Sequence, residues 1–209
     1  MLPGPAPAAP DPTSGFEYEW KPASIVERVR WCDVFGREAP VEVDFGCGEG
    51  AFLLERARRE PGIHFLGTER LAGRVEKVCR TAAREGLANV RLLRLESAYT
   101  VQYLVPPESV SAAHVLFPDP WPKRAHQTRR LIQDSFVEAV RRALVPAGLL
   151  HLKTDDLPYF QWMQKVLERA VGWREIPWTE APAYPVTNFE ARFLAQGLPI
   201  HRALFQKVH

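Results

Sequence analysis

Short apolar segments alternate with longer amphipathic segments along most of the chain. The apolar segments have the length of buried strands, and the segments between them repeat apolar residues with the period of a helix. Such alternation predicts right-handed βαβ units and an α/β fold with a mostly parallel, doubly wound sheet that carries helices on both faces. We expect strands at 41–45, 63–68, 90–95, 112–117 and 148–153, and helices at 51–60, 70–85, 98–105, 128–145 and 156–171.

The two ends of the chain differ in composition. Residues 1–15 contain five prolines between small residues, which predicts a disordered tail, and residues 16–209 are expected to form a single domain. Ser24 is expected to cap a helix that reaches residue 35, and the stretch 200–208 to complete the sheet.

Overall composition excludes several classes of protein. The 27 basic and 25 acidic residues give a net charge of +2, so a surface for a polyanion has to come from local clustering. The 3 cysteines show no metal-ligand or disulfide spacing, and no metal is expected. Neither a leader pattern nor an apolar stretch of ~18 residues is present, which predicts a cytoplasmic protein without a membrane partner.

Acidic residues stand at or just after the ends of the five predicted strands: Asp44, Glu69, Glu96, Asp119 and Asp155. Open α/β sheets bind ligands at this edge. The turn Gly46-x-Gly48-x-x-Ala51 also satisfies the dinucleotide fingerprint, which keeps a nicotinamide-dependent oxidoreductase open. Clustered acids disfavour a pyrophosphate and favour a ligand with hydroxyls and positive charge, such as S-adenosylmethionine. Each single acid is equally compatible with capping the helix that follows it.

Residues 117–123 read Phe-Pro-Asp-Pro-Trp-Pro-Lys. The two prolines beside Asp119 restrict its backbone from both sides, which aims its carboxylate. A run of basic residues without an acid follows: Lys123, Arg124, His126, Arg129 and Arg130. An aimed acid beside such a run indicates chemistry on a nucleic acid, and Trp121 either stacks on an unpaired base or packs under the turn.

These features together resemble the bacterial tRNA (guanine-N7)-methyltransferases, which are class I enzymes that use S-adenosylmethionine. The resemblance covers residues 40–208 and is most specific in the block at 117–123. It also rests on 44–50, Gly67-Thr68-Glu69, Thr154-Asp155 and the segment Thr187-Asn188-Phe189-Glu190. It implies a Rossmann-like fold and methyl transfer to N7 of a guanine in the variable loop of tRNA, by a monomer or a homodimer.

The resemblance also implies a role for individual residues. The cofactor pocket would be lined by Asp44, Gly46, Gly48, Glu69, Glu96 and Asp119, with Asp119 also at the reaction centre. The target nucleotide would be held by Lys123, Asp155, Thr187, Asn188, Phe189 and Glu190. Contacts to tRNA would come from Arg124, His126, Arg129 and Arg130.

The chain departs from the family pattern at two positions, with Glu96 in place of the usual Asp and Asn188 in place of the usual Lys. Other readings of the sequence are a methyltransferase for another RNA or a small molecule, and an RNA-binding domain without activity. His64, His114 and His151 lie within predicted strands, where we expect satisfied core histidines and no metal site.

Overall fold

The computed structural model of the protein describes residues 17–208. The proline-rich tail predicted at 1–15 lies outside the described residues.

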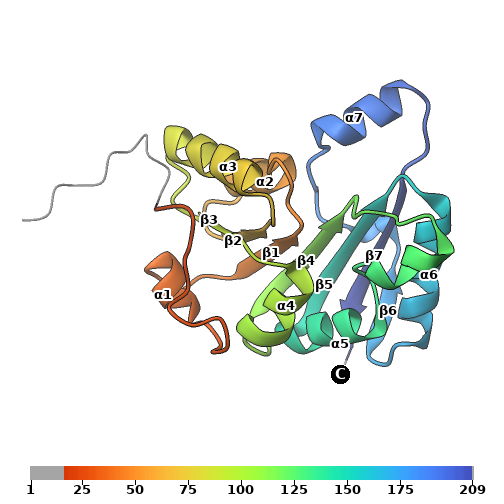
Figure 1. Cartoon of the computed structure of the whole chain (residues 1–209), viewed down its shortest axis with the longest axis horizontal. Coiled ribbons are helices and arrows are strands. Elements are labelled where there is room, and N and C mark those ends of the chain that lie inside the picture. Colours follow the sequence, from red (N-terminus) through yellow and green to blue (C-terminus); the bar gives the residue numbers. More distant parts are fainter. Residues whose placement is uncertain (1–16, 209) are drawn as a thin grey trace, which may run out of the picture.

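A seven-stranded sheet in the order β3-β2-β1-β4-β5-β7-β6 forms the centre of the fold (Figure 1). Six strands run in the same direction, and β7 runs antiparallel between β5 and β6. The strands are β1 (Val41–Phe45), β2 (His64–Thr68), β3 (Val90–Leu93), β4 (Val110–Leu116), β5 (Leu144–Thr154), β6 (Trp173–Ile176) and β7 (His201–Lys207). The prediction of a mostly parallel sheet is confirmed.

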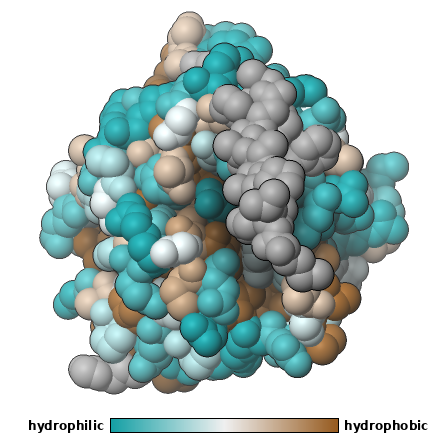
Figure 2. All heavy atoms as spheres, turned by 90° about the vertical axis from the view of Figure 1, so that its left-hand side faces the viewer, coloured by the Kyte–Doolittle hydropathy of each residue, from teal (hydrophilic) through white to brown (hydrophobic). Residues whose placement is uncertain are grey.

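Helices cover both faces of this sheet. The α-helices are α1 (Trp31–Phe35), α2 (Ala51–Arg59), α3 (Ala72–Glu85), α4 (Ser97–Tyr99), α5 (Asp134–Ala143), α6 (Leu157–Arg169) and α7 (Asn188–Ala195). Shorter helical turns are the π-helix η1 (Thr100–Leu104) and the 3₁₀-helices η2 (Arg124–Arg129) and η3 (Trp178–Glu180). The surface on the side of α1, α2 and α3 is mostly hydrophilic, with small apolar areas between polar ones (Figure 2).

Two apolar cores lie on opposite faces of the sheet because the side chains of a strand alternate between its faces. Val41, Val43 and Phe45 of β1 pack with α1, η1, α5 and α6. Phe65 of β2 packs with α2 and α3 on the other side. In α3 the buried residues recur at one helical face, and Gly86 ends the helix in a left-handed conformation.

Three predicted elements have different bounds in the structure. The helix expected at 128–145 is η2 followed by α5, because Leu144 pairs with Val110 as part of β5. The helix expected at 98–105 begins at Ser97 and continues as a π-helix. Only Trp31–Phe35 is helical near the N-terminus, and the hydroxyl of Ser24 accepts a hydrogen bond from Val26 instead of capping that helix.

Three elements were not predicted from the sequence: β6, η3 and α7. In Figure 1, α7 lies beyond the carboxyl ends of β4 and β5, apart from the other helices. Among the described residues, no helix is both long enough and apolar enough to cross a membrane.

Candidate functional site

The sheet order brings the predicted acids to one edge. Strands β3, β2, β1, β4 and β5 are neighbours and parallel, so their carboxyl ends lie side by side. Asp44 is the last but one residue of β1, and the other predicted acids follow the ends of the remaining four strands: Glu69, Glu96, Asp119 and Asp155. The structure therefore places all of these residues along the same rim.

The glycine turn after β1 is fixed by the end of β2. The backbone N–H groups of Gly46 and Cys47 donate to the carbonyl of Thr68, at 3.0 and 2.9 Å. Gly46 and Gly48 have φ angles of +79° and +57°, which L-residues with a side chain rarely adopt, and a Cβ atom on either would meet no atom within 4 Å. A ligand can therefore approach the backbone of this turn closely.

The hydroxyl of Thr68 connects the first three strand ends. Its Oγ1 atom is fully buried, accepts from the backbone N–H of Gly46 at 3.2 Å, and lies 2.9 Å from the hydroxyl of Ser97. These hydrogen bonds join the glycine turn, the end of β2 and the start of α4 into one unit. Glu96 directly precedes Ser97 and therefore lies next to this unit.

Asp44 is a buried carboxyl group, with 3% of its surface exposed. Desolvation raises its pKa to about 7, and no side-chain hydrogen bond to it is found within residues 17–208. Burial, followed by the charges of Asp44 and Glu69, also raises the pKa of the neighbouring Cys47 thiol. A positively charged ligand group placed here would compensate the cost of ionising Asp44.

Glu69 and Glu96 both accept hydrogen bonds from the backbone that follows them. Glu69 Oε1 accepts from the N–H groups of Arg70 and Leu71, at 2.7 and 2.9 Å. Glu96 caps α4 by accepting from Ala98 and Tyr99, at 3.0 and 2.6 Å. The capping interpretation therefore holds for Glu96, whereas Glu69 binds the turn before α3, whose N-cap residue Leu71 has no side-chain cap. A carboxylate has about four acceptor positions, so each of the two acids can still accept from a ligand.

Asp119 lies exposed in a strained turn. Phe117 and Trp121 have positive φ angles of 53° and 44°, which are unfavourable for large side chains and persist only when the surroundings impose them. The backbone N–H of Phe117 donates to the carbonyl of Lys153 at 2.8 Å. Such strain is characteristic of functional sites, and the turn holds Asp119 at the rim between β4 and β5.

Arg130 contacts this turn from inside the protein, whereas the sequence analysis predicted a contact of Arg130 with tRNA. Its side chain is buried, with 5% exposed, and its Nε donates to the carbonyl of Pro120 at 2.8 Å. The guanidinium also stacks over Tyr159, at 4.8 Å from the ring centre. In this structure the guanidinium of Arg130 is therefore engaged within the protein, and we leave it out of the tRNA contacts proposed below.

The remaining basic residues lie outside the turn. Lys123 and Arg129 are exposed, His126 is half-buried, and Arg124 begins η2. The guanidinium of Arg129 lies 5.1 Å above the ring of half-buried Trp121. Because α5 begins only at Asp134, Arg129 does not lie in the first turn of that helix.

The segment Thr187–Glu190 forms the start of α7. The hydroxyl of Thr187 caps the helix by accepting from the N–H of Glu190 at 3.0 Å. The exposed Phe189 ring packs edge-on against the ring of Phe117, with the two ring centres 4.7 Å apart. Asn188 is the first residue of the helix, and Asp155 lies exposed after β5.

Glu190 is bound to Lys153, a residue that the sequence analysis missed. Lys153 Nζ lies 3.0 and 2.8 Å from the two carboxylate oxygens, and both side chains are 3% exposed. Burial lowers the pKa of Lys153, whereas the bonds to Glu190 oppose that decrease. A lysine within the apolar strand sequence before Thr154-Asp155 was the available signal. This ion pair attaches α7 to the end of β5.

A buried polar network lies on the same face of the sheet as the side chain of Lys153. Arg56 of α2 donates to Glu42 of β1 at 2.6 and 3.2 Å, and His114 Nε2 lies 3.0 Å from the same carboxylate. His114 Nδ1 lies 3.2 Å from Nδ1 of His151 in β5. The three histidines predicted within strands are buried as expected, but they are not all satisfied, because His64 Nδ1 and His151 Nε2 lack a partner among the described residues.

A hollow of about 260 Å³ lies between Glu96 and the segment 128–136. Its walls therefore combine Glu96, which was predicted to contact the cofactor, with a segment whose Arg129 and Arg130 were predicted to contact tRNA. Within residues 17–208, no three His, Cys, Asp or Glu side chains are grouped in a way that could hold a metal ion.

Comparison with known proteins gives one consistent fold and family. A family model described as "Putative methyltransferase" matches residues 38–203. Solved structures similar in fold include the 16S rRNA methyltransferase KamB, with a TM-score of 0.61 and 15% identity over 86% of this chain and 93% of that one. A SAM dependent methyltransferase from Aquifex aeolicus has a TM-score of 0.57 and 16% identity over 82% and 84% of the two chains. The fold is thus the Rossmann-like fold of the class I methyltransferases.

Curated relatives are more similar in sequence. The tRNA (guanine-N(7)-)-methyltransferase of Chromohalobacter salexigens is 39% identical over 84% of this chain and 74% of its own. The enzyme of the same name from Vibrio vulnificus is 32% identical over 94% and 82% of the two chains. Similarity of this extent to proteins of one name, together with the match to the family model, shows that the chain belongs to the tRNA (guanine-N(7)-)-methyltransferase family.

Proposed function

We propose that the protein transfers a methyl group from S-adenosylmethionine to N7 of a guanine in the variable loop of tRNA. The observation that carries this proposal is the rim itself: a glycine turn and a series of acids stand at the ends of neighbouring parallel strands, and exposed cations stand beside them. Membership of a methyltransferase family removes the nicotinamide-dependent alternative. A methyltransferase for another RNA or a small molecule is disfavoured by the basic run beside Asp119.

The donors and acceptors of the rim fit S-adenosylmethionine, which supplies a methyl group on a positively charged sulfur. Asp44 is a buried carboxyl group that gains from a cationic neighbour, and the open backbone at Gly46 and Gly48 allows close approach. Glu69 and Glu96 keep acceptor positions for the hydroxyls of a ribose and the amino group of an adenine.

The target guanosine would lie between the turn after β4 and the start of α7. Lys123, Asp155 and the segment 187–190 would hold it, although Glu190 of that segment is already bound to Lys153. Guanine N7 carries a lone pair and no proton, so its attack on a methyl group needs no general base. The contribution of the protein is then to hold the two reactants in line.

Asp119 is the residue we assign to the reaction centre. Methylation makes the guanine cationic, and a fixed carboxylate beside it favours the charge that develops in the transition state. A hydrogen bond from the amino group of guanine to Asp119 would orient the base in addition. The exposed Lys123 and Arg129, together with Arg124 and His126, would contact tRNA phosphates.

The test is nucleoside analysis of tRNA incubated with the protein and methyl-labelled S-adenosylmethionine. The expected product is N7-methylguanosine. Label on another base, or on another atom of guanine, would refute the assignment, and a protein that binds the cofactor but labels no tRNA would indicate a different substrate.

A further inference from the structure

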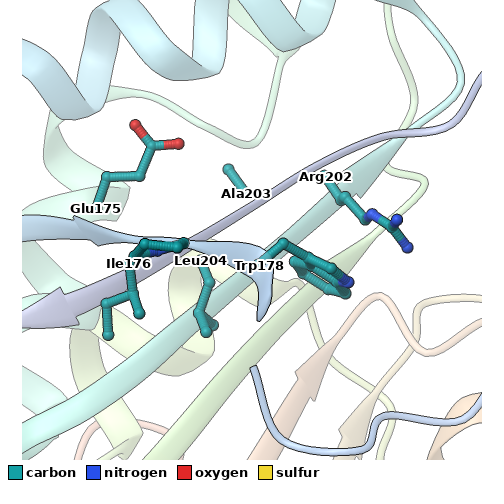
Figure 3. A pocket seen from close by; sticks show the side chains of 7 residues that line it. Glu175, Ile176, Trp178, Arg202, Ala203 and Leu204 are labelled. Atoms are coloured by element: carbon teal, nitrogen blue, oxygen red, sulfur yellow. The ribbon is translucent and has the colours of Figure 1, made fainter. Parts of the chain in front are cut away.

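A pocket is formed by residues of β6, η3 and β7 and the link between β6 and η3 (Figure 3). It has a volume of about 300 Å³ and is lined by Glu175, Ile176, Pro177, Trp178, Arg202, Ala203 and Leu204. Arg202 is the partner of Lys153 in the pairing of β7 with β5. Because directly opposed residues of antiparallel strands point to the same face, the pocket adjoins the ion pair that attaches α7.

Two side chains give the pocket its chemical character. Arg202 is exposed, and its guanidinium carbon lies 4.8 Å from the centre of the half-buried Trp178 ring. Within residues 17–208, Arg202 forms no ion pair with a carboxylate, whereas the neighbouring Lys153 is bound to Glu190. Glu175, the acid of the pocket, lies on the side away from Arg202 (Figure 3). The charge of Arg202 is therefore available to an anionic ligand.

The same pairing of arginine with tryptophan occurs beside Asp119, where Arg129 lies over Trp121. In the sheet, β5 lies between β4 and β7, so the two pairs stand on opposite sides of Asp155 at the rim. A strand of RNA that presents its target nucleotide at the rim can extend toward both pairs.

We propose that the pocket binds a nucleotide of tRNA that neighbours the target guanosine. The guanidinium of Arg202 binds its phosphate, and the Trp178 ring with Pro177 offers an apolar surface for its base or ribose. A nucleotide fits this pocket because it joins an anionic phosphate to a flat base. The pocket likewise joins an exposed cation, Arg202, to the aromatic ring of Trp178. This inference rests on the proposed function, since it requires an RNA substrate.

The test compares the variants Arg202→Gln, Arg202→Lys and Arg174→Gln with the wild-type protein. Arg174 is an exposed arginine on β6 that does not line the pocket, so it controls for the loss of one positive charge. We expect Arg202→Gln to weaken tRNA binding about tenfold and to reduce the slope of log affinity against log salt by about 0.7. Arg202→Lys should restore most of the salt slope, and Arg174→Gln should leave the slope unchanged.

Other outcomes assign a different role to Arg202. A purely structural contact with Trp178 predicts a lower melting temperature for Arg202→Gln with an unchanged salt slope, and that result overturns the inference. Equal effects of Arg202→Gln and Arg174→Gln also overturn it, because they reflect net charge alone. Wild-type protein that methylates no tRNA would instead refute the proposed function, so the two failures can be distinguished.

Discussion

Asp44 and Asp119 differ in solvent exposure and therefore in what they contribute. Asp44 is enclosed beside the glycine turn, where ionisation is unfavourable without a positive partner. Asp119 is exposed on a strained turn that Arg130 supports from below. The first carboxyl group is suited to compensate a fixed charge of a bound cofactor, and the second to act on a charge that develops on a base.

Asp44 predicts a specific dependence of stability on pH. Its pKa of about 7 in the folded protein exceeds its ordinary value, so the folded state binds more protons than the unfolded state between roughly pH 4 and 7. Stability contributed by Asp44 is therefore full below about pH 4 and falls as the pH rises to about 7. Over this range, the free energy of unfolding of wild-type protein should fall relative to Asp44→Asn by a few kcal/mol, which urea unfolding at several pH values measures. Parallel curves for the two proteins would contradict the assignment.

Asp119→Asn tests the role of charge at the reaction centre. The amide keeps the size and hydrogen-bonding ability of the side chain but lacks a negative charge, so we expect the turnover number to fall by roughly 10²–10³-fold. Because Asp119 is exposed, the melting temperature should remain within about 1 °C of the wild-type value. Near-normal turnover would limit Asp119 to forming the turn.

The sequence identified the residues of the rim, but not what some of them contact. Acids at predicted strand ends can be placed at one edge because parallel strands share a direction. The burial of Arg130 and the pairing of Glu190 with Lys153 depend on segments that are distant in sequence and meet only in the folded chain. A pattern of charges along the chain cannot distinguish an exposed cation from one enclosed by Tyr159.

At the scale of elements, α7 depends on few attachments. Its main links to the sheet are the buried Lys153–Glu190 pair and the contact of Phe189 with Phe117. The sequence did not predict this helix, because its apolar residues Phe189 and Leu194 are exposed and do not form a buried stripe. Strand β7 confirms the prediction that the stretch 200–208 completes the sheet, but its antiparallel direction, which brings Arg202 to the rim, was not predicted.

Removing one partner of the buried pair should release α7. Lys153→Met leaves the Glu190 carboxylate buried without a partner, which costs about 3–5 kcal/mol unless the helix leaves the sheet. We therefore expect faster hydrogen exchange of the α7 amides in Lys153→Met, and recovery of protection in the double variant Lys153→Met, Glu190→Leu. The exposed pair Arg169–Asp134 is the matched control, and Arg169→Ala should change local stability by at most about 1 kcal/mol. Unchanged protection of α7 in Lys153→Met would show that the pair does not hold the helix.

For the whole molecule, tRNA binding should depend on where positive charge is concentrated, because the net charge is only +2. Lys123→Ala with Arg129→Ala should weaken tRNA binding and flatten its salt dependence by about 0.7 per lost phosphate contact, without changing the affinity for S-adenosylhomocysteine. Arg80→Ala with Arg169→Ala removes the same charge from exposed positions on α3 and α6. Equal effects of the two double variants would show that overall charge, and not the basic run, binds the RNA.

Methyl transfer to one guanine of tRNA is the central claim, and mapping the transferred methyl group tests it most directly. Two tRNA transcripts that differ only by guanine or adenine at the target position of the variable loop are incubated with the protein and methyl-labelled S-adenosylmethionine. The account predicts N7-methylguanosine at that position in the first transcript and no label in the second. Equal labelling of both transcripts, or a methyl group on any other atom, would contradict it.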